Sequence, residues 1–247
     1  IRTFDLGGDK LAPLSSEKQE ENPYLGNRGI RFSLSRPDIF SPQVRAILRA
    51  SVFGKVQIMF PMIMDAEDFR KAKKFVQTCQ QELSVQGIAF SQEIPLGAMI
   101  EIPSAALCSE ELARECDFLS IGTNDLVQYT LAADRNNESV SSYYIQHHPS
   151  VLGLIKQTVE SAKKYQTPLS VCGEMASHPQ YIPLLIGMGI TELSVNPGSF
   201  LIAKSIVQKC DDRLFALTEN LNFVTPIYIV EHLINIDLKS YYANREE

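Results

Sequence analysis

The sequence predicts an α/β fold built on a parallel sheet, and two observations lead to this prediction. Short apolar runs alternate with longer segments of helical periodicity, and chemically capable polar residues follow three of those runs directly. Such runs are typical of strands buried on both faces, and their alternation with helices builds βαβ units. The predicted strands are residues 1–6, 56–60, 96–102, 118–121, 169–172 and 192–195.

The longer segments between the strands supply a loop and two helices. Residues 7–29 are rich in Gly, Pro, Ser and charge, and a loop of this length in a compact domain is usually functional. A helix is expected over 65–86, where Phe69, Ala72 and Val76 recur near the 3.6-residue period, and another over about 152–164.

The last part of the chain is predicted to be a helical tail. Residues 214–221 and 227–241 have helical patterns, and Pro226 separates them because proline lacks an amide hydrogen. We therefore divide the chain into a domain over 1–210 and a tail over 211–247. The pattern does not indicate what the tail does.

The composition favours a globular protein and gives no support to a nucleic-acid-binding or membrane-spanning one. The 247 residues are 45% hydrophobic and 21% charged, which suits one large globular domain. A net charge of −6 gives no support to nucleic-acid binding, and no apolar run reaches the roughly 18 residues of a membrane helix. Five widely spaced cysteines favour reduced thiols, hence a cytoplasmic location. Since the chain begins with Ile1, a fragment of a longer protein is expected.

Polar residues gather where the third, fourth and fifth predicted strands end. Glu101 closes the third strand, Asn124 and Asp125 follow the fourth, and Cys172 and Glu174 stand at the end of the fifth. In a β/α barrel the carboxyl ends of the strands form the active-site face. The pattern therefore favours a barrel with its site at this edge.

Glu101 and Asp125 are candidate ligands of a divalent cation. Mg²⁺ prefers oxygen ligands and usually takes one or two carboxylates together with water and substrate phosphate. The alternative is that Glu101 is solvated at a strand end and that Asp125 caps a helix beginning at Leu126. The pattern alone leaves both open.

Three arginines and one cysteine complete the candidate site. Arg2, Arg28 and Arg135 lie near predicted strand ends, and a guanidinium group matches phosphate or carboxylate with two parallel hydrogen bonds. The alternative for each is an ordinary surface arginine. Cys172 is either a small core residue or, beside Glu174, a group that transfers protons.

The histidines form no recognisable site. The adjacent pair His147 and His148 is taken as loop, and His178 and His232 have no supporting cluster. No Walker loop and no GxGxxG sequence occurs, which argues against nucleotide binding by those devices.

Four segments resemble the signatures of phosphoenolpyruvate-utilising enzymes, in the order of that family. They are Arg2-Thr3-Phe4-Asp5 with GGDK at 7–10, NPYLGNRGIR at 22–31, SIGTNDLVQYT at 120–130, and Cys172-Gly173-Glu174. The similarity extends to about Gln208. The residues at 128–135 and 172–176 are most similar to enzyme I, the phosphotransferase branch that serves bacterial sugar uptake. Pyruvate phosphate dikinase and phosphoenolpyruvate synthase are the alternatives.

The resemblance implies a TIM-type (β/α)8 barrel, truncated before its second strand, and a role for each matched residue. Glu101 and Asp125 would ligate Mg²⁺. Cys172 would protonate C3 of the enolate and release pyruvate. The residues implied to bind substrate are Arg2, Arg28, Asn124, Asp125 and Arg135.

Two departures from the family limit the expected activity. The phosphorylated histidine of the family lies in an N-terminal domain, and none of the four histidines here has its setting. The barrel strand that precedes Arg2 in the family is also absent. The implied partners are that phosphohistidine domain, through it the histidine phosphocarrier protein, and a second copy in a homodimer. A non-catalytic regulatory module remains the alternative.

Overall fold

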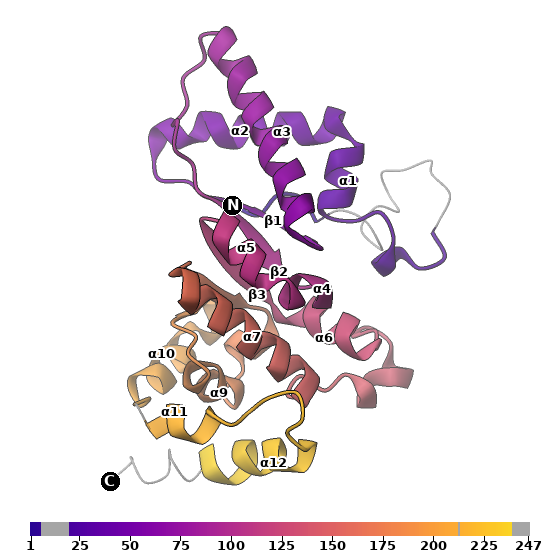
Figure 1. The fold of residues 1–247 in the computed structure, drawn as a ribbon, viewed down its shortest axis with the longest axis vertical. Helices are drawn as coiled ribbons and strands as arrows, with labels where there is room; N and C mark the ends of the chain where they lie inside the picture. The colour runs from indigo at the N-terminus through magenta and orange to yellow at the C-terminus, as the bar shows by residue number, and fades with distance from the viewer. Residues whose placement is uncertain (6–19, 212, 239–247) are drawn as a thin grey trace.

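The computed structural model describes residues 1–5, 20–211 and 213–238, and its centre is one parallel sheet (Figure 1). The strands follow one another in chain order, and Arg2 extends the sheet through an isolated bridge to Met59. The strands are β1 (Ile58–Phe60), β2 (Leu96–Ile100), β3 (Phe118–Gly122), β4 (Leu169–Cys172) and β5 (Glu192–Leu193). The predicted α/β fold is thereby confirmed, and five of the six predicted strands lie within a few residues of those expected. The strand predicted over 1–6 is wrong for the described residues 1–5, which form only the bridge at Arg2.

The helices cover the sheet and join its parallel strands. Helix α3 follows the prediction closely: it begins after Asp65, whose side chain accepts a hydrogen bond from the Asp68 amide at 2.9 Å, and it buries Phe69 and Val76. The helices before the tail are α1 (Ile30–Ser35), α2 (Pro37–Ala50), α3 (Ala66–Val85), α4 (Pro103–Leu107), α5 (Ser109–Glu115), α6 (Thr123–Leu131), α7 (Pro149–Tyr165), α8 (Glu174–Ser177), α9 (Tyr181–Gly187) and α10 (Phe200–Gln208).

The strand register brings the chemically capable ends of three strands together. Residues of β2 and β3 pair from Gly97 with Phe118 to Ile100 with Ile121, and Gly122 of β3 lies opposite Cys172 of β4. All residues of β2 are buried, as expected for a strand covered on both faces. The turns that leave these three strands therefore emerge at the same edge of the sheet.

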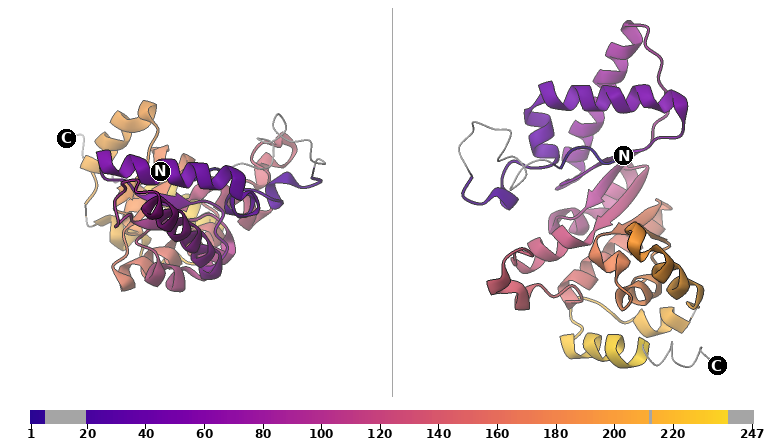
Figure 2. Two further views of the ribbon diagram at one scale, coloured as in Figure 1. Left: turned by 90° about the horizontal axis from the view of Figure 1, so that it is seen from above. Right: turned by 180° about the vertical axis from the view of Figure 1, so that it is seen from behind.

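The sheet does not close into a barrel over the described residues. The strand order runs from β1 to β5 without a pairing between the two ends. Helices α1 to α3 lie at one end of the molecule and α9 and α10 toward the other (Figures 1 and 2). Beside the short edge strand β5, helix α10 exposes Phe200, Leu201 and Ile202. The prediction of an incomplete barrel is confirmed.

The tail packs onto the end of the molecule that carries α7 and α9. It contains α11 (Arg213–Thr218) and α12 (Ile227–His232), and Pro226 is the N-cap of α12. A π-helical turn over Leu233–Asp237 continues α12, and the predicted residues 239–241 lie outside the described part. The buried side chains of the tail that join the main core are Leu221, Val230, Leu233, Ile234 and Leu238.

The contact between Phe223 and α7 gives a test of how the tail is held. Gly153 lies in α7, and a Cβ atom there would stand 2.5 Å from the Phe223 ring. Gly153→Ala should favour α7 itself by about 1 kcal/mol of helix propensity but displace Phe223. We expect limited proteolysis to cut 219–226 several-fold faster while the rest of the chain stays intact. Gly54→Ala, where a Cβ meets nothing within 4 Å, is the control. Unchanged cleavage would show that this contact does not hold the tail.

Candidate active site

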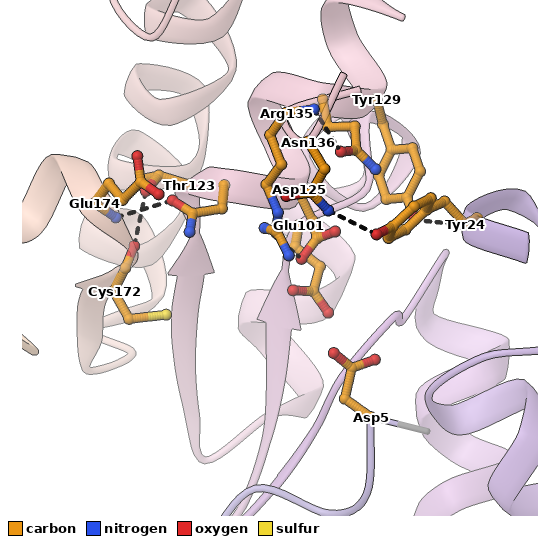
Figure 3. Close-up of polar contacts among 12 residues, drawn as sticks. Asp5, Tyr24, Glu101, Thr123, Asp125, Tyr129, Arg135, Asn136, Cys172 and Glu174 are labelled. Carbon is orange, nitrogen blue, oxygen red and sulfur yellow. Dashed lines mark hydrogen bonds and ion pairs between the residues drawn. The ribbon is translucent and has the colours of Figure 1, made fainter. Parts of the chain in front are cut away.

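A buried arginine is the centre of the polar edge of the sheet. The Arg28 side chain donates from Nη2 and Nε to the two oxygens of Asp5, at 2.9 and 3.3 Å. Its Nη1 donates to Asp125 Oδ1 and to Tyr129 Oη, each at 2.9 Å. Asp125 and Tyr129 are four residues apart in α6, so both face the same side of that helix. Figure 3 labels the three partners, Asp5, Asp125 and Tyr129.

Arg28 keeps its charge although only 3% of it is exposed. Burial lowers the pKa of Arg28, but the hydrogen bond to Asp5 and the negative charges of Asp125 and Asp5 outweigh it and raise the pKa above its ordinary value. A buried cation with two carboxylate partners is stable in place, whereas removing either partner would leave a charge uncompensated.

The segment before Arg28 closes over α6 through tyrosine contacts. Tyr129 Oη donates to the Tyr24 carbonyl at 2.5 Å, and burial raises the pKa of Tyr129 to about 12, so it stays a neutral donor. Asn136 Nδ2 donates to Tyr24 Oη at 2.8 Å (Figure 3). The predicted functional loop therefore contacts the site in its described part, residues 20–28.

Glu101 lies just beyond β2 and is only 1% exposed. Its Oε1 accepts a 2.6 Å hydrogen bond from the Met62 amide. Burial, together with the negative charge of Asp125, raises the pKa of Glu101 to about 8. Met62 has a positive φ of 58°, and a Cβ on Gly29 would stand 2.7 Å from the Met62 side chain. The strained backbone at Met62 thus aims its amide at Glu101, and only glycine fits opposite it.

The carboxylates Glu101 and Asp125 suit a hard cation that arrives with substrate. No cluster of three or more His, Cys, Asp or Glu residues that could hold a metal occurs among the described residues. Asp5 is occupied by Arg28 through both oxygens. Two buried oxygen donors that repel each other fit Mg²⁺ with its remaining positions on water and phosphate, since Mg²⁺ rarely takes an all-protein cage.

The second part of the site surrounds Cys172 at the end of β4. Thr123 Oγ1 donates to the Cys172 carbonyl at 2.9 Å, and Asn124 Oδ1 accepts from the Glu174 amide at 2.9 Å (Figure 3). Gly173 has a φ of 97°, and a Cβ there would stand 2.3 Å from Thr123 Oγ1, so the turn requires glycine. Burial raises the pKa of Cys172, which keeps the thiol protonated.

Cys172 faces a hollow of about 540 Å³ at the edge of the sheet. Asn124 and Glu174 line it from the turns that follow β3 and β4, and Ser194 and Asn196 line it from beyond β5. A small molecule would fit a space of this size, with Cys172 at one wall.

The chain matches a family model described as the PEP-binding domain of PEP-utilising enzymes, over residues 1–212, where PEP is phosphoenolpyruvate. The chain belongs to this family.

Three curated relatives, each named phosphoenolpyruvate-protein phosphotransferase, are similar to most of the chain. The protein of Mycoplasma capricolum is 46% identical over 211 residues, which is 85% of this chain and 37% of that protein. The Staphylococcus carnosus protein is 45% identical over 212 residues, covering 86% and 37%. The Listeria monocytogenes protein is 42% identical over 233 residues, covering 94% and 41%. The chain thus spans about two fifths of the length of its relatives.

Solved structures of distant proteins share the fold alone. A citrate lyase from Burkholderia xenovorans superposes with a TM-score of 0.52 at 21% identity, covering 74% of this chain and 58% of that chain. A Haloferax volcanii malate synthase superposes with a TM-score of 0.53 at 15% identity, covering 83% and 63%. No helix among the described residues of this PEP-utilising family member is long and apolar enough to cross a membrane.

The structure brings the residues predicted from sequence to one edge and overturns two of the alternatives. The alternative of a solvated Glu101 is wrong, because Glu101 is buried. Arg2 Nη1 lies 3.7 Å from Asp5 Oδ2, and Arg135 Nη1 lies 3.7 Å from Asp125 Oδ2. The alternative of a helix capped by Asp125 is wrong: α6 begins at Thr123, which places Asp125 within its first turn. The carboxyl group is therefore aimed at Arg28 and not at the start of the helix.

Sequence reasoning missed Asp5 and Tyr129 as site residues. Asp5 is the last but one residue of the strand predicted over 1–6, so its position near a strand end was a signal. Tyr129 lies one helical turn beyond Asp125. The histidines also have defined places. His148 is the N-cap of α7, and the Nδ1 atom of His147 is 3.0 Å from Tyr181 Oη.

The raised pKa of Glu101 predicts a pH-dependent cost in stability. The folded chain binds a proton at Glu101 up to about pH 8, whereas the unfolded chain loses it near 4.5. The contribution of Glu101 to the free energy of unfolding is therefore fully present below pH 4.5 and is lost as the pH rises through 8. Glu101→Gln, which resembles the protonated form, should raise the unfolding free energy by about 3 kcal/mol at pH 7, with the gain growing from pH 4.5 to 8.

Thermal unfolding in a chelating buffer at several pH values measures this effect. Glu67→Gln is the control, because the Glu67 carboxylate is exposed in its pair with Arg70. If Glu101→Gln does not raise the unfolding free energy, or raises it equally at every pH, then Glu101 is not protonated in the folded chain.

Proposed function

We propose that this chain binds phosphoenolpyruvate with Mg²⁺ and forms the site from which its phosphoryl group passes to a histidine on another domain. One observation carries the proposal: the predicted ligands from four separate parts of the chain converge on Arg28 and Asp125 at the carboxyl edge of the sheet. The family match and the names of the relatives support the same substrate and reaction.

The charges of the site suit this trianionic substrate. Arg2, Arg28 and Arg135 supply guanidinium groups for its phosphate and carboxylate, and Asn124 supplies an amide beside them. In the substrate-free site Asp5 and Asp125 form ion pairs with Arg28. Glu101 and Asp125 would hold the Mg²⁺, which supplies Lewis-acid neutralisation of the phosphate oxygens. When metal and substrate bind together, the ion pairs of Arg28 with Asp5 and Asp125 are replaced by ion pairs of Arg28 with the substrate and of Asp125 with the metal.

The bond changes define the role of Cys172. The bond between phosphorus and the enol oxygen breaks, and the histidine nitrogen forms the new bond to phosphorus. This chemistry depends mainly on positioning and on charge neutralisation, which the arginines provide. The enolate that remains takes a proton at C3 from the Cys172 thiol, and pyruvate leaves.

The partners come from the same proposal. The acceptor histidine lies on an N-terminal domain of the full-length enzyme, which passes the phosphoryl group to the histidine phosphocarrier protein in the cytoplasm. The enzyme acts as a homodimer. Within the family, the alternative is the barrel domain of a pyruvate phosphate dikinase or a phosphoenolpyruvate synthase. A regulatory paralogue without catalytic activity is the other alternative. The similarity to three phosphotransferases over most of the chain favours the first assignment.

Titration calorimetry tests binding directly. Phosphoenolpyruvate is expected to bind this chain in the presence of Mg²⁺ and to lose affinity in excess chelator. Arg135→Ala should weaken binding by about 10- to 100-fold, since it removes a charge-assisted contact. Arg36→Ala is the matched control, because Arg36 pairs with Asp38 at an exposed position away from the site. Equal affinity with and without chelator would remove the metal from the proposal, and normal affinity of Arg135→Ala would remove that arginine.

Cys172→Ala separates chemistry from binding. A neutral thiol adds little to a site of arginines and metal, so affinity for phosphoenolpyruvate should stay close to normal. Turnover should fall by about 10²- to 10⁴-fold, the usual contribution of general acid catalysis. We would measure pyruvate formation in a chimera in which this chain replaces the matching segment of the Staphylococcus carnosus relative. Near-normal turnover would make Cys172 a core residue.

A further inference from the structure

Two serine hydroxyl groups lie beneath Cys172 on the same face of the sheet. Ser120 of β3 and Ser170 of β4 are opposite each other in the strand register, and Ser170 is two residues before Cys172, so the two side chains point the same way. Ser120 is only 4% exposed. The interior of a β/α barrel is normally filled with branched apolar side chains, and a buried hydroxyl is costly unless it is hydrogen-bonded.

The two hydroxyl groups form a directed chain that ends at sulfur. Ser170 Oγ donates to Ser120 Oγ at 2.9 Å, and Ser120 Oγ donates to Cys172 Sγ at 3.9 Å. A hydroxyl has one hydrogen. Because Ser120 accepts from Ser170, its own hydrogen is directed at the sulfur. Cys172 is thus the acceptor in this contact, and its thiol hydrogen is left to point elsewhere.

We propose that Ser120 and Ser170 are positioning residues that orient the Cys172 thiol and stabilise the thiolate left after proton transfer. The inference rests on the proposed role of Cys172. In that step the S–H bond breaks, the C3–H bond of pyruvate forms, and sulfur keeps the electron pair. Water then returns a proton to the thiolate. Ser120 holds the sulfur from below in both states.

The surroundings of the sulfur explain why such a donor is needed. Burial is the largest influence and raises the pKa of Cys172, and the carboxylates Glu101 and Asp125 act in the same direction. The hydrogen bond from Ser120 is the largest influence that lowers the pKa, followed by the positive charge of Arg2. Without Ser120, the thiolate would form in a buried position without the hydrogen bond that most favours it.

The rate of Cys172 alkylation by iodoacetamide, measured on this chain from pH 7 to 10, tests the proposal without substrate. Peptide mass spectrometry separates Cys172 from the exposed Cys108, which serves as the internal reference. Ser120→Ala should move the Cys172 profile to higher pH and slow alkylation about 3- to 10-fold at pH 8.5, since only the thiolate reacts. Ser170→Ala should move it the same way by less.

The matched control is Ser194→Ala, because Ser194 lines the hollow beside Cys172 without a hydrogen bond to the sulfur. Its profile should superpose on that of the unchanged chain. A Ser120→Ala profile that also superposes would overturn the proposal. Should Ser120→Ala fail to fold by circular dichroism, Ser170→Ala decides alone: an unshifted profile means that no directed chain exists.

Turnover in the chimera distinguishes this inference from the proposed function. Ser120→Ala should lower the rate of pyruvate formation while calorimetric affinity for phosphoenolpyruvate stays within about twofold, because neither serine contacts the substrate. Normal turnover of Cys172→Ala would reject the acid role itself. A strong loss in Cys172→Ala together with normal turnover and an unshifted alkylation profile in Ser120→Ala would reject the serines alone.

Discussion

The burial of one positive charge organises this molecule. Arg28 connects Asp5, near the start of the chain, to α6, through partners 23, 97 and 101 residues away in the chain. A guanidinium group with five donors in a plane can satisfy these three partners at once. Because a buried charge without partners costs several kcal/mol, the segments that hold Asp5, Asp125 and Tyr129 must stay together.

The site around this charge is assembled against local preference. Glu101 is buried beside another carboxylate, and the Met62 backbone adopts a left-handed conformation to reach it. A Cβ on Gly122 would stand 2.8 Å from Glu101 Oε2, so the strand end must approach the carboxylate closely. Strain and like-charge repulsion at one edge are typical of functional sites, where the stability of the rest of the fold maintains them.

The hydrophobic pattern was enough to predict the sheet, because a strand buried on both faces has to be apolar throughout. It also placed Glu101, Asp125 and Cys172 at strand ends, which in a parallel sheet share one edge. The pattern did not reveal the contact of Phe223 with α7, since this contact depends on which surfaces meet. For the same reason, the pattern did not distinguish Ser120 and Ser170 from other strand residues.

The sequence by itself determined the order of the strands, the edge that carries the chemistry and the family. These depend on local periodicity and on motifs that the chain order preserves. Only the tertiary structure decided which charges meet. In the structure Asp5 and Asp125 form ion pairs with Arg28, and Ser120 donates a hydrogen bond to Cys172. Such contacts join residues far apart in the chain, and their energies depend on distance and burial, which only the folded backbone sets.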